Sequence, residues 1–102
     1  MEIEYHPAIE HELKEIVRYY NECSFGLGNE FLDEFEKQIL KIADIPQQWM
    51  VVQKDIRRSD IRRSLMNKFS YVIYYRIVNT NLVRVTVIKH QRRHPKLGLN
   101  RE

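Results

Sequence analysis

The chain has 102 residues, of which 43% are hydrophobic and 30% are charged. A length near ~100 residues is typical of one small domain, and this apolar content predicts a buried core rather than disorder, so we expect a single domain over residues 1–102. The longest apolar run, residues 71–75, is far shorter than the ~20 residues of a membrane helix, and no basic-then-apolar leader opens the chain. We therefore expect no membrane association and a cytoplasmic location.

The formal net charge of +3 conceals an uneven distribution along the chain. Residues 1–50 contain four Lys/Arg and eleven Asp/Glu, whereas residues 51–102 contain thirteen and three, so the halves carry −7 and +10. Such asymmetry predicts an anionic partner, either nucleic acid or an acidic protein, for the surface that the second half forms. The alternative is that the two halves neutralise each other across the fold.

The first half predicts a strand followed by two helices. Residues 1–5 alternate apolar and polar side chains, which is typical of a half-buried strand. Apolar residues at helical spacing predict a first helix from about Pro7 to Cys23, and a second apolar stripe, from Phe31 to Ile45, ends at Pro46. Because the intervening residues 24–28 contain two glycines, the two helices are expected to form a hairpin.

The second half changes to β-rich runs, separated by turn-like segments at residues 67–70 and 79–81. The predicted strands are Ile61–Met66, Tyr71–Ile77 and Leu82–His90. Residues 47–58 are either a long surface loop or a loop with a short extra strand. The sequence therefore predicts an α+β fold: an N-terminal strand, a two-helix hairpin, and an antiparallel three-stranded β-meander.

The last hairpin predicts how side chains face one another. A three-residue loop at 79–81, with Asn81 in the left-handed conformation, fixes the register of its two strands. The apolar face then pairs Ile77 with Val83, Tyr75 with Val85 and Ile73 with Val87, and the other face pairs Arg76 with Arg84 and Tyr74 with Thr86. Since facing like charges are unfavourable in isolation, the two arginines suggest an anion between them. The alternative is that both side chains point into solvent or pair with a helix carboxylate.

Basic side chains are interleaved with tyrosines throughout the predicted sheet. Guanidinium groups bind phosphate oxygens, and aromatic rings stack on unpaired bases, so the pattern favours RNA or single-stranded nucleic acid. The residues expected to bind nucleic acid or another target are Arg62, Tyr74, Arg76, Lys89 and Arg92. A solvated basic face is the plainer alternative.

Cleavage of RNA would need a base, a cation beside the phosphate and an acid for the leaving oxygen. The residues that could supply these groups, if they converge, are Arg84, His90, Arg93 and either Tyr74 or Tyr75. No metal or other cofactor is expected, because the four scattered histidines and one helical cysteine match no ligand spacing. That cysteine, Cys23, belongs to the apolar stripe and is expected to be buried.

Five segments occur in an order that resembles a known family. They are "EYHPAIEHELKEIVRYY", "LGNEFLDEFEKQI", an "RR" pair before Phe69–Tyr71, "YYRI", and an "H-x-x-R-x-P" ending at His90, Arg93 and Pro95. Over nearly the whole chain they resemble the RelE/ParE superfamily, which comprises toxins of type II toxin–antitoxin modules and includes plasmid stabilisation toxins. The resemblance matches Arg63 to a basic strand position of the family, and His90 and Arg93 to its ending.

The resemblance implies a growth-arresting toxin that is neutralised by a small antitoxin encoded beside it. RelE-like members cut messenger RNA on the ribosome, whereas ParE-like members inhibit DNA gyrase and need no nuclease site. The "YY" of the first helix and the "HQRRHP" ending resemble the ParE-like branch, while the basic sheet would suit a ribonuclease. If the chain is an enzyme, the candidate catalytic residues are Arg63, Arg84, His90 and Arg93. The assembly would be a homodimer or a toxin–antitoxin hetero-oligomer.

Two further alternatives remain open. One is a non-catalytic RNA-binding module whose arginines contact only phosphates. The other is a degenerate family member that keeps only antitoxin binding.

Overall fold

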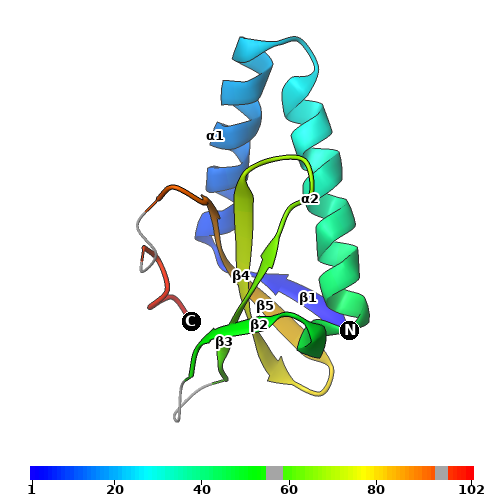
Figure 1. Ribbon diagram of the computed structural model, residues 1–102, viewed down its shortest axis with the longest axis vertical. Helices are drawn as coiled ribbons and strands as arrows, with labels where there is room; N and C mark the ends of the chain where they lie inside the picture. Colours follow the sequence, from blue (N-terminus) through cyan, green and yellow to red (C-terminus); the bar gives the residue numbers. More distant parts are fainter. Residues whose placement is uncertain (55–58, 94–96) are drawn as a thin grey trace.

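The computed structural model describes residues 1–54, 59–93 and 97–102 (Figure 1). Its elements are β1 (Glu2–Tyr5), α1 (Ala8–Cys23), α2 (Leu27–Asp44), the short 3-10 helix η1 (Pro46–Gln48), β2 (Met50–Gln53), β3 (Ile61–Leu65), β4 (Tyr71–Asn79) and β5 (Leu82–His90). All strands lie in one sheet of order β1-β5-β4-β3-β2. Adjacent strands of the sheet are antiparallel, except that β1 and β5 are parallel to each other. The predicted α+β fold is confirmed.

Residues 47–58 were expected to form either a long surface loop or a loop with a short extra strand. The structure shows the second, since this segment contains strand β2. Strand β2 pairs antiparallel with β3 and forms one edge of the sheet. Residues 55–58 lie outside the described part of the chain.

The helix hairpin depends on a close approach at Gly28. A Cβ atom added there would overlap the Val17 carbonyl oxygen, so only glycine lets the helices come this near. Asn21 Oδ1 accepts a hydrogen bond of 2.8 Å from the Gly28 amide. Helix α2 therefore begins at Leu27, within the predicted loop, after a turn in which Gly26 has φ +81°.

Cys23 was expected to be buried and is exposed instead. It lies at the end of α1, where the hairpin projects beyond the described strands of the sheet (Figure 1). Phe25, in the turn that follows, is exposed for the same reason.

The main core lies between the hairpin and one face of the sheet (Figure 1). The helices contribute Ile9, Phe31, Phe35, Ile39 and Ile42, and the strands contribute Ile73, Tyr75, Val83, Val85 and Ile88. Burying an aliphatic or aromatic side chain of this size contributes about 1.5–3 kcal/mol, so this layer holds the helices to the sheet.

The opposite face of the sheet is covered by the C-terminal segment, residues 97–102. Leu99 packs against a second buried cluster formed by Ile61, Val72, Tyr74 and Val87. Arg76 and Lys89, also on this face, donate hydrogen bonds to carbonyl oxygens of the segment. Strand β4 is therefore buried on both faces over much of its length.

The predicted register of β4 and β5 is correct near the turn and wrong beyond it. Ile77 pairs with Val83, Tyr75 with Val85 and Arg76 with Arg84, as expected. Farther along, Tyr74 pairs with Val87 and Ile73 with Ile88, because the register shifts by one at Thr86. This shift is a β-bulge, in which two residues of one strand lie opposite a single residue of the partner strand. The extra residue is Thr86, and its hydroxyl donates a hydrogen bond to the Tyr74 carbonyl.

The turn between these strands also differs from the expectation. Asn79 pairs with Leu82, so the connection is two residues long rather than three. Asn81 does not adopt the left-handed conformation. Its amide instead donates a 2.8 Å hydrogen bond to Asn79 Oδ1, and this side-chain contact closes the turn.

Tyr75 supports a prediction about stability. Its fully buried hydroxyl donates a 2.6 Å hydrogen bond to the Pro46 carbonyl, and burial raises its pKa above 10.0. Because the unfolded chain ionises this phenol at a lower pH than the folded chain does, Tyr75 lowers the free energy of unfolding as pH rises above 10. Tyr75→Phe should cost about 1 kcal/mol at pH 7 and weaken this alkaline dependence.

Denaturant unfolding at pH 7 and above pH 10 measures both effects. Tyr19→Phe is the control at pH 7, since Tyr19 is 60% exposed and its substitution should cost little. If wild type and Tyr75→Phe lose stability equally above pH 10, Tyr75 is not the source of the dependence.

Candidate functional site

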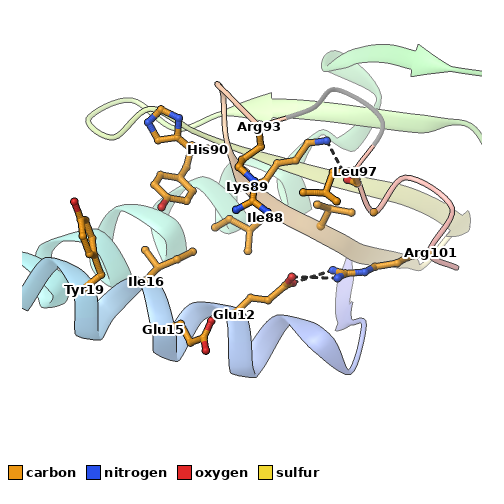
Figure 2. Close-up of a pocket in the computed structure, with 13 residues that line it drawn as sticks. Glu12, Glu15, Ile16, Tyr19, Ile88, Lys89, His90, Arg93, Leu97 and Arg101 are labelled. Carbon is orange, nitrogen blue, oxygen red and sulfur yellow. Dashed lines mark hydrogen bonds and ion pairs between the residues drawn. The ribbon is translucent and has the colours of Figure 1, made fainter.

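A charged cleft of about 330 Å³ lies between α1, the end of β5 and the C-terminal segment (Figure 2). It forms there because β1 is only four residues long and pairs with residues 82–85 of β5. None of the described strands lies beside the last four residues of β5, from Val87 to His90, on this side, and these residues line the cleft instead.

One wall of the cleft is acidic and comes from α1. Glu12, Glu15 and Tyr19 follow one another at helical spacing and lie beside Ile16 (Figure 2). Glu15 Oε1 lies 3.1 Å from His11 Nε2 on the same helix.

Arg101 joins this wall to the C-terminal segment. Its two terminal nitrogens donate to Glu12 Oε1 and Oε2 at 2.8 and 3.1 Å, which is a bidentate arrangement (Figure 2). One of these nitrogens also donates to the Thr86 carbonyl at 3.2 Å. Arg101 therefore connects the helix, the bulge of β5 and the segment that covers the sheet.

The opposite wall is basic and contains Lys89, His90 and Arg93. Lys89 Nζ donates to the Leu97 carbonyl at 3.0 Å and lies 4.8 Å from the centre of the Tyr74 ring. Burial, and then the positive charge of Arg93, lower the pKa of Lys89. Two positive groups thus lie near each other at this end of the cleft.

The hydrogen bonding of His90 determines which of its ring nitrogens is a donor. The Arg92 amide donates to His90 Nδ1 at 3.0 Å, so the proton of the neutral ring is on Nε2. The ring packs edge-on against Tyr71, with 5.3 Å between the ring centres. Burial raises the pKa of the Tyr71 hydroxyl, and Arg93 partly offsets this effect. The raised pKa of Tyr71 keeps its hydroxyl protonated at neutral pH, so this hydroxyl can act as a hydrogen-bond donor.

The facing arginines of β4 and β5 have partners within the chain. Arg84 Nε lies 2.9 Å from Glu4 Oε1, so its carboxylate comes from strand β1 rather than from a helix. Arg76 is only 2% exposed and donates to the carbonyl oxygens of Ser59, Leu99 and Arg101.

The two arginines of β3 lie on opposite faces of the sheet. Arg62 donates to the carbonyl oxygens of Gln47 and Trp49 at 3.1 and 2.8 Å. Arg63 lies between Met50 of β2 and Tyr74 of β4, and its buried Nε has no hydrogen-bond partner among the described residues. Because β4 separates β3 from β5, Arg63 does not reach the cleft.

Of the predicted site residues, the structure brings Lys89, His90 and Arg93 together in the cleft. It places Arg62, Arg63, Tyr74, Arg76 and Arg84 elsewhere in the sheet, and Arg92 lies exposed in the turn after β5. Pro95, part of the family-like ending, lies outside the described residues.

The acidic wall and Arg101 were not predicted from the sequence. The polar residues 12, 15 and 19 around an apolar Ile16 were a usable signal, whereas nothing local marked Arg101. Within residues 1–54, 59–93 and 97–102, no group of His, Cys, Asp and Glu side chains could hold a metal ion. The described helices include none that is long and apolar enough to cross a membrane.

The comparisons with known proteins agree on one class. A strand, a helix hairpin and an antiparallel sheet define a small α+β domain of the RelE/ParE type, and the solved structure of the "Chromosomal ParDE TA system from P. aeruginosa" has this fold. The TM-score to that structure is 0.70 at 10% identity, over 88% of this chain and 95% of that one. No curated protein matches the chain. The family described as ParE toxin of type II toxin-antitoxin system, parDE, matches residues 3–95, and the chain belongs to it.

The contact between Glu12 and Arg101 supports a second prediction. Both side chains are partly buried, so their coupling should be about 1 kcal/mol, above the usual value for an exposed pair. Arg101→Gln should also loosen the C-terminal segment, whose Arg101 amide donates to the Gly98 carbonyl.

A double-mutant cycle with Glu12→Gln and Arg101→Gln measures the coupling, and hydrogen exchange of the Arg101 amide measures the loosening. Glu15→Gln is the matched control on the same wall, since Glu15 pairs with His11. Unchanged exchange in Arg101→Gln would show that other contacts hold the segment.

Proposed function

We propose that this chain is the toxin of a two-component toxin–antitoxin module and that it arrests growth by inhibiting DNA gyrase rather than by cutting messenger RNA. Membership of the ParE toxin family supports the toxin role. The single observation that carries the choice of target is that the candidate catalytic residues do not converge. Arg63 and Arg84 lie on other parts of the sheet, away from His90 and Arg93.

The groups that do meet in the cleft are poorly suited to RNA scission. Attack by a 2′-hydroxyl needs a base, but His90 Nδ1 already accepts a hydrogen bond from the Arg92 amide. Tyr71 is no better as a base, because its raised pKa keeps the phenol protonated. Glu15 on the facing wall, which unlike Glu12 has no bidentate arginine among the described residues, would repel the scissile phosphate.

The RNA-binding alternative has less support from the same contacts. A phosphate-binding sheet needs arginines and lysines that are open to the ligand. Arg62, Arg76 and Lys89 instead donate to main-chain carbonyls, and Arg84 pairs with Glu4.

A small antitoxin is the expected partner. The similar solved structure is that of a ParDE system, and the matched family consists of toxins of a type II toxin–antitoxin system. The basic turn after β5 would suit an acidic segment of such a protein.

Assays of the purified chain separate the two targets. We expect it to inhibit gyrase supercoiling and to leave messenger RNA intact in a ribosome-dependent translation reaction. His90→Asn and His90→Gln should keep growth arrest within about twofold, because the ring performs no proton transfer in gyrase inhibition; a nuclease that used His90 as an acid or base would lose about 10²–10⁴-fold in rate.

Three outcomes would contradict the proposal. Fragmented messages with normal supercoiling would identify the chain as a ribonuclease. Normal growth on good expression of wild type would remove the toxin role. Loss of arrest in both histidine variants, with folding retained, would assign His90 to the toxic activity.

A further inference from the structure

The turn at the tip of the helix hairpin holds a large apolar side chain in solvent. Phe25 is fully exposed, at 104%, and lies where the hairpin projects beyond the described strands (Figure 1). The turn around it is well defined, because the Leu27 amide donates to the Ser24 carbonyl at 3.0 Å and Gly26 supplies a left-handed conformation. An uncovered ring contributes little to folding, and an ordered turn presents it as an anchor for another molecule.

An open apolar groove of about 560 Å³ lies between the two helices of the same hairpin. Leu13, Val17 and Leu32 supply its apolar surface, and polar side chains, mostly from α1, form its rim. Among the described residues, none lines both this groove and the charged cleft, so the two sites are separate. A groove of this size and composition can accept an aromatic ring, whose burial is favourable.

The rim of the groove carries opposite charges one helical turn apart. Arg18 and Glu22 are exposed and lie four residues apart on α1, which is about 6 Å along the helix. Neither has an ion-pair partner within residues 1–54, 59–93 and 97–102. Two copies related by a two-fold axis present the same patch to each other. An axis midway between these two residues therefore brings Arg18 of each copy opposite Glu22 of the other.

The same axis aligns the exposed ring with the groove. Phe25 lies three residues beyond Glu22, so it faces about the level of residue 15 in the second copy. Leu13 and Val17, which line the groove, lie on either side of that level. Because the tip and the groove belong to one hairpin, each copy can insert its ring into the other, and this reciprocal contact closes the pair.

We propose that the chain forms a two-fold dimer in which Phe25 of each copy enters the groove between α1 and α2 of the other, flanked by two Arg18–Glu22 ion pairs. An aromatic side chain buries about 150–250 Å², so two rings and the groove surface they cover reach only the low end of specific interfaces, near ~1,200 Å². We therefore expect a dissociation constant on the order of 10 µM. Dimerisation of this kind requires neither the charged cleft nor the toxin role.

Phe25→Ser tests the anchor and should leave the fold intact, because the ring is fully exposed. In sedimentation equilibrium of the purified chain, from about 1 to 100 µM, it should weaken dimerisation at least ~100-fold, since each dimer loses two buried rings. Leu40→Ser is the matched control. Leu40 is 71% exposed on α2 and does not line the groove, so dimerisation should stay within about threefold of wild type.

Exchange of the two charges tests the alignment of the copies. Arg18→Glu places two pairs of carboxylates opposite each other and should weaken dimerisation about tenfold. The double variant Arg18→Glu, Glu22→Arg restores opposite charges across the interface and should return to within about threefold of wild type. A variant that had lost its fold would not be rescued by the second change.

A wild-type chain that stays monomeric at about 100 µM would overturn the proposal. Open polymers in place of dimers would overturn the two-fold arrangement. Equal dimerisation by Phe25→Ser and Leu40→Ser would show that another surface joins the copies, and failure of the charge exchange to restore dimers would refute the Arg18–Glu22 contact. A monomeric chain whose Phe25→Ser variant loses binding to the antitoxin or inhibition of gyrase would overturn the proposal in favour of that partner.

Discussion

The burial of Arg76 in the central strand is the constraint on which the rest of the structure depends. A guanidinium that is 2% exposed is stable only when its donors are satisfied, because an unpaired buried charge costs several kcal/mol. Arg76 donates to the carbonyls of Ser59, Leu99 and Arg101, and so fixes the C-terminal segment over the outer face of the sheet. That placement brings Arg101 to Glu12 and forms one end of the cleft. A residue of β4 therefore determines the shape of a site in which it takes no part.

Much of the fold could be predicted because its signals are local. The apolar stripes of α1 and α2, and the β-rich runs of β3, β4 and β5, are visible in short windows of sequence. The bulge at Thr86 could not be predicted, because a threonine fits a regular ladder position equally well. The parallel pairing of β1 with β5 depends on contacts about eighty residues apart, for which one sequence carries no local signal. The helix start at Leu27 was missed because Gly28 serves the contact with Val17 rather than a loop.

In the cleft too, residues that are close in sequence could be predicted, whereas contacts between distant residues could not. The dense run of basic residues at the end of β5 and in the turn after it marked Lys89, His90 and Arg93, which are close in sequence and line the same cleft. The Glu12 and Arg101 side chains come together from opposite ends of the chain. Composition alone also could not distinguish an arginine that supports the fold from one that is open to a partner. Arg62, Arg76 and Arg84 all lie in the basic half and all have partners within the chain.

The net charge of +3 can now be interpreted element by element. The interpretation that the two halves neutralise each other is confirmed in part, since Glu4–Arg84 and Glu12–Arg101 join the acidic half to the basic half, and the anionic partner stays a prediction. At physiological salt the Debye length is about 8 Å, so a partner responds to the local charge of the surface it touches rather than to the sum over the chain. Around the cleft, that local charge is positive at Arg93 and negative at Glu15. A surface with this short-range alternation discriminates against a uniform polyanion and favours a partner whose own charges alternate, as those of a protein segment can.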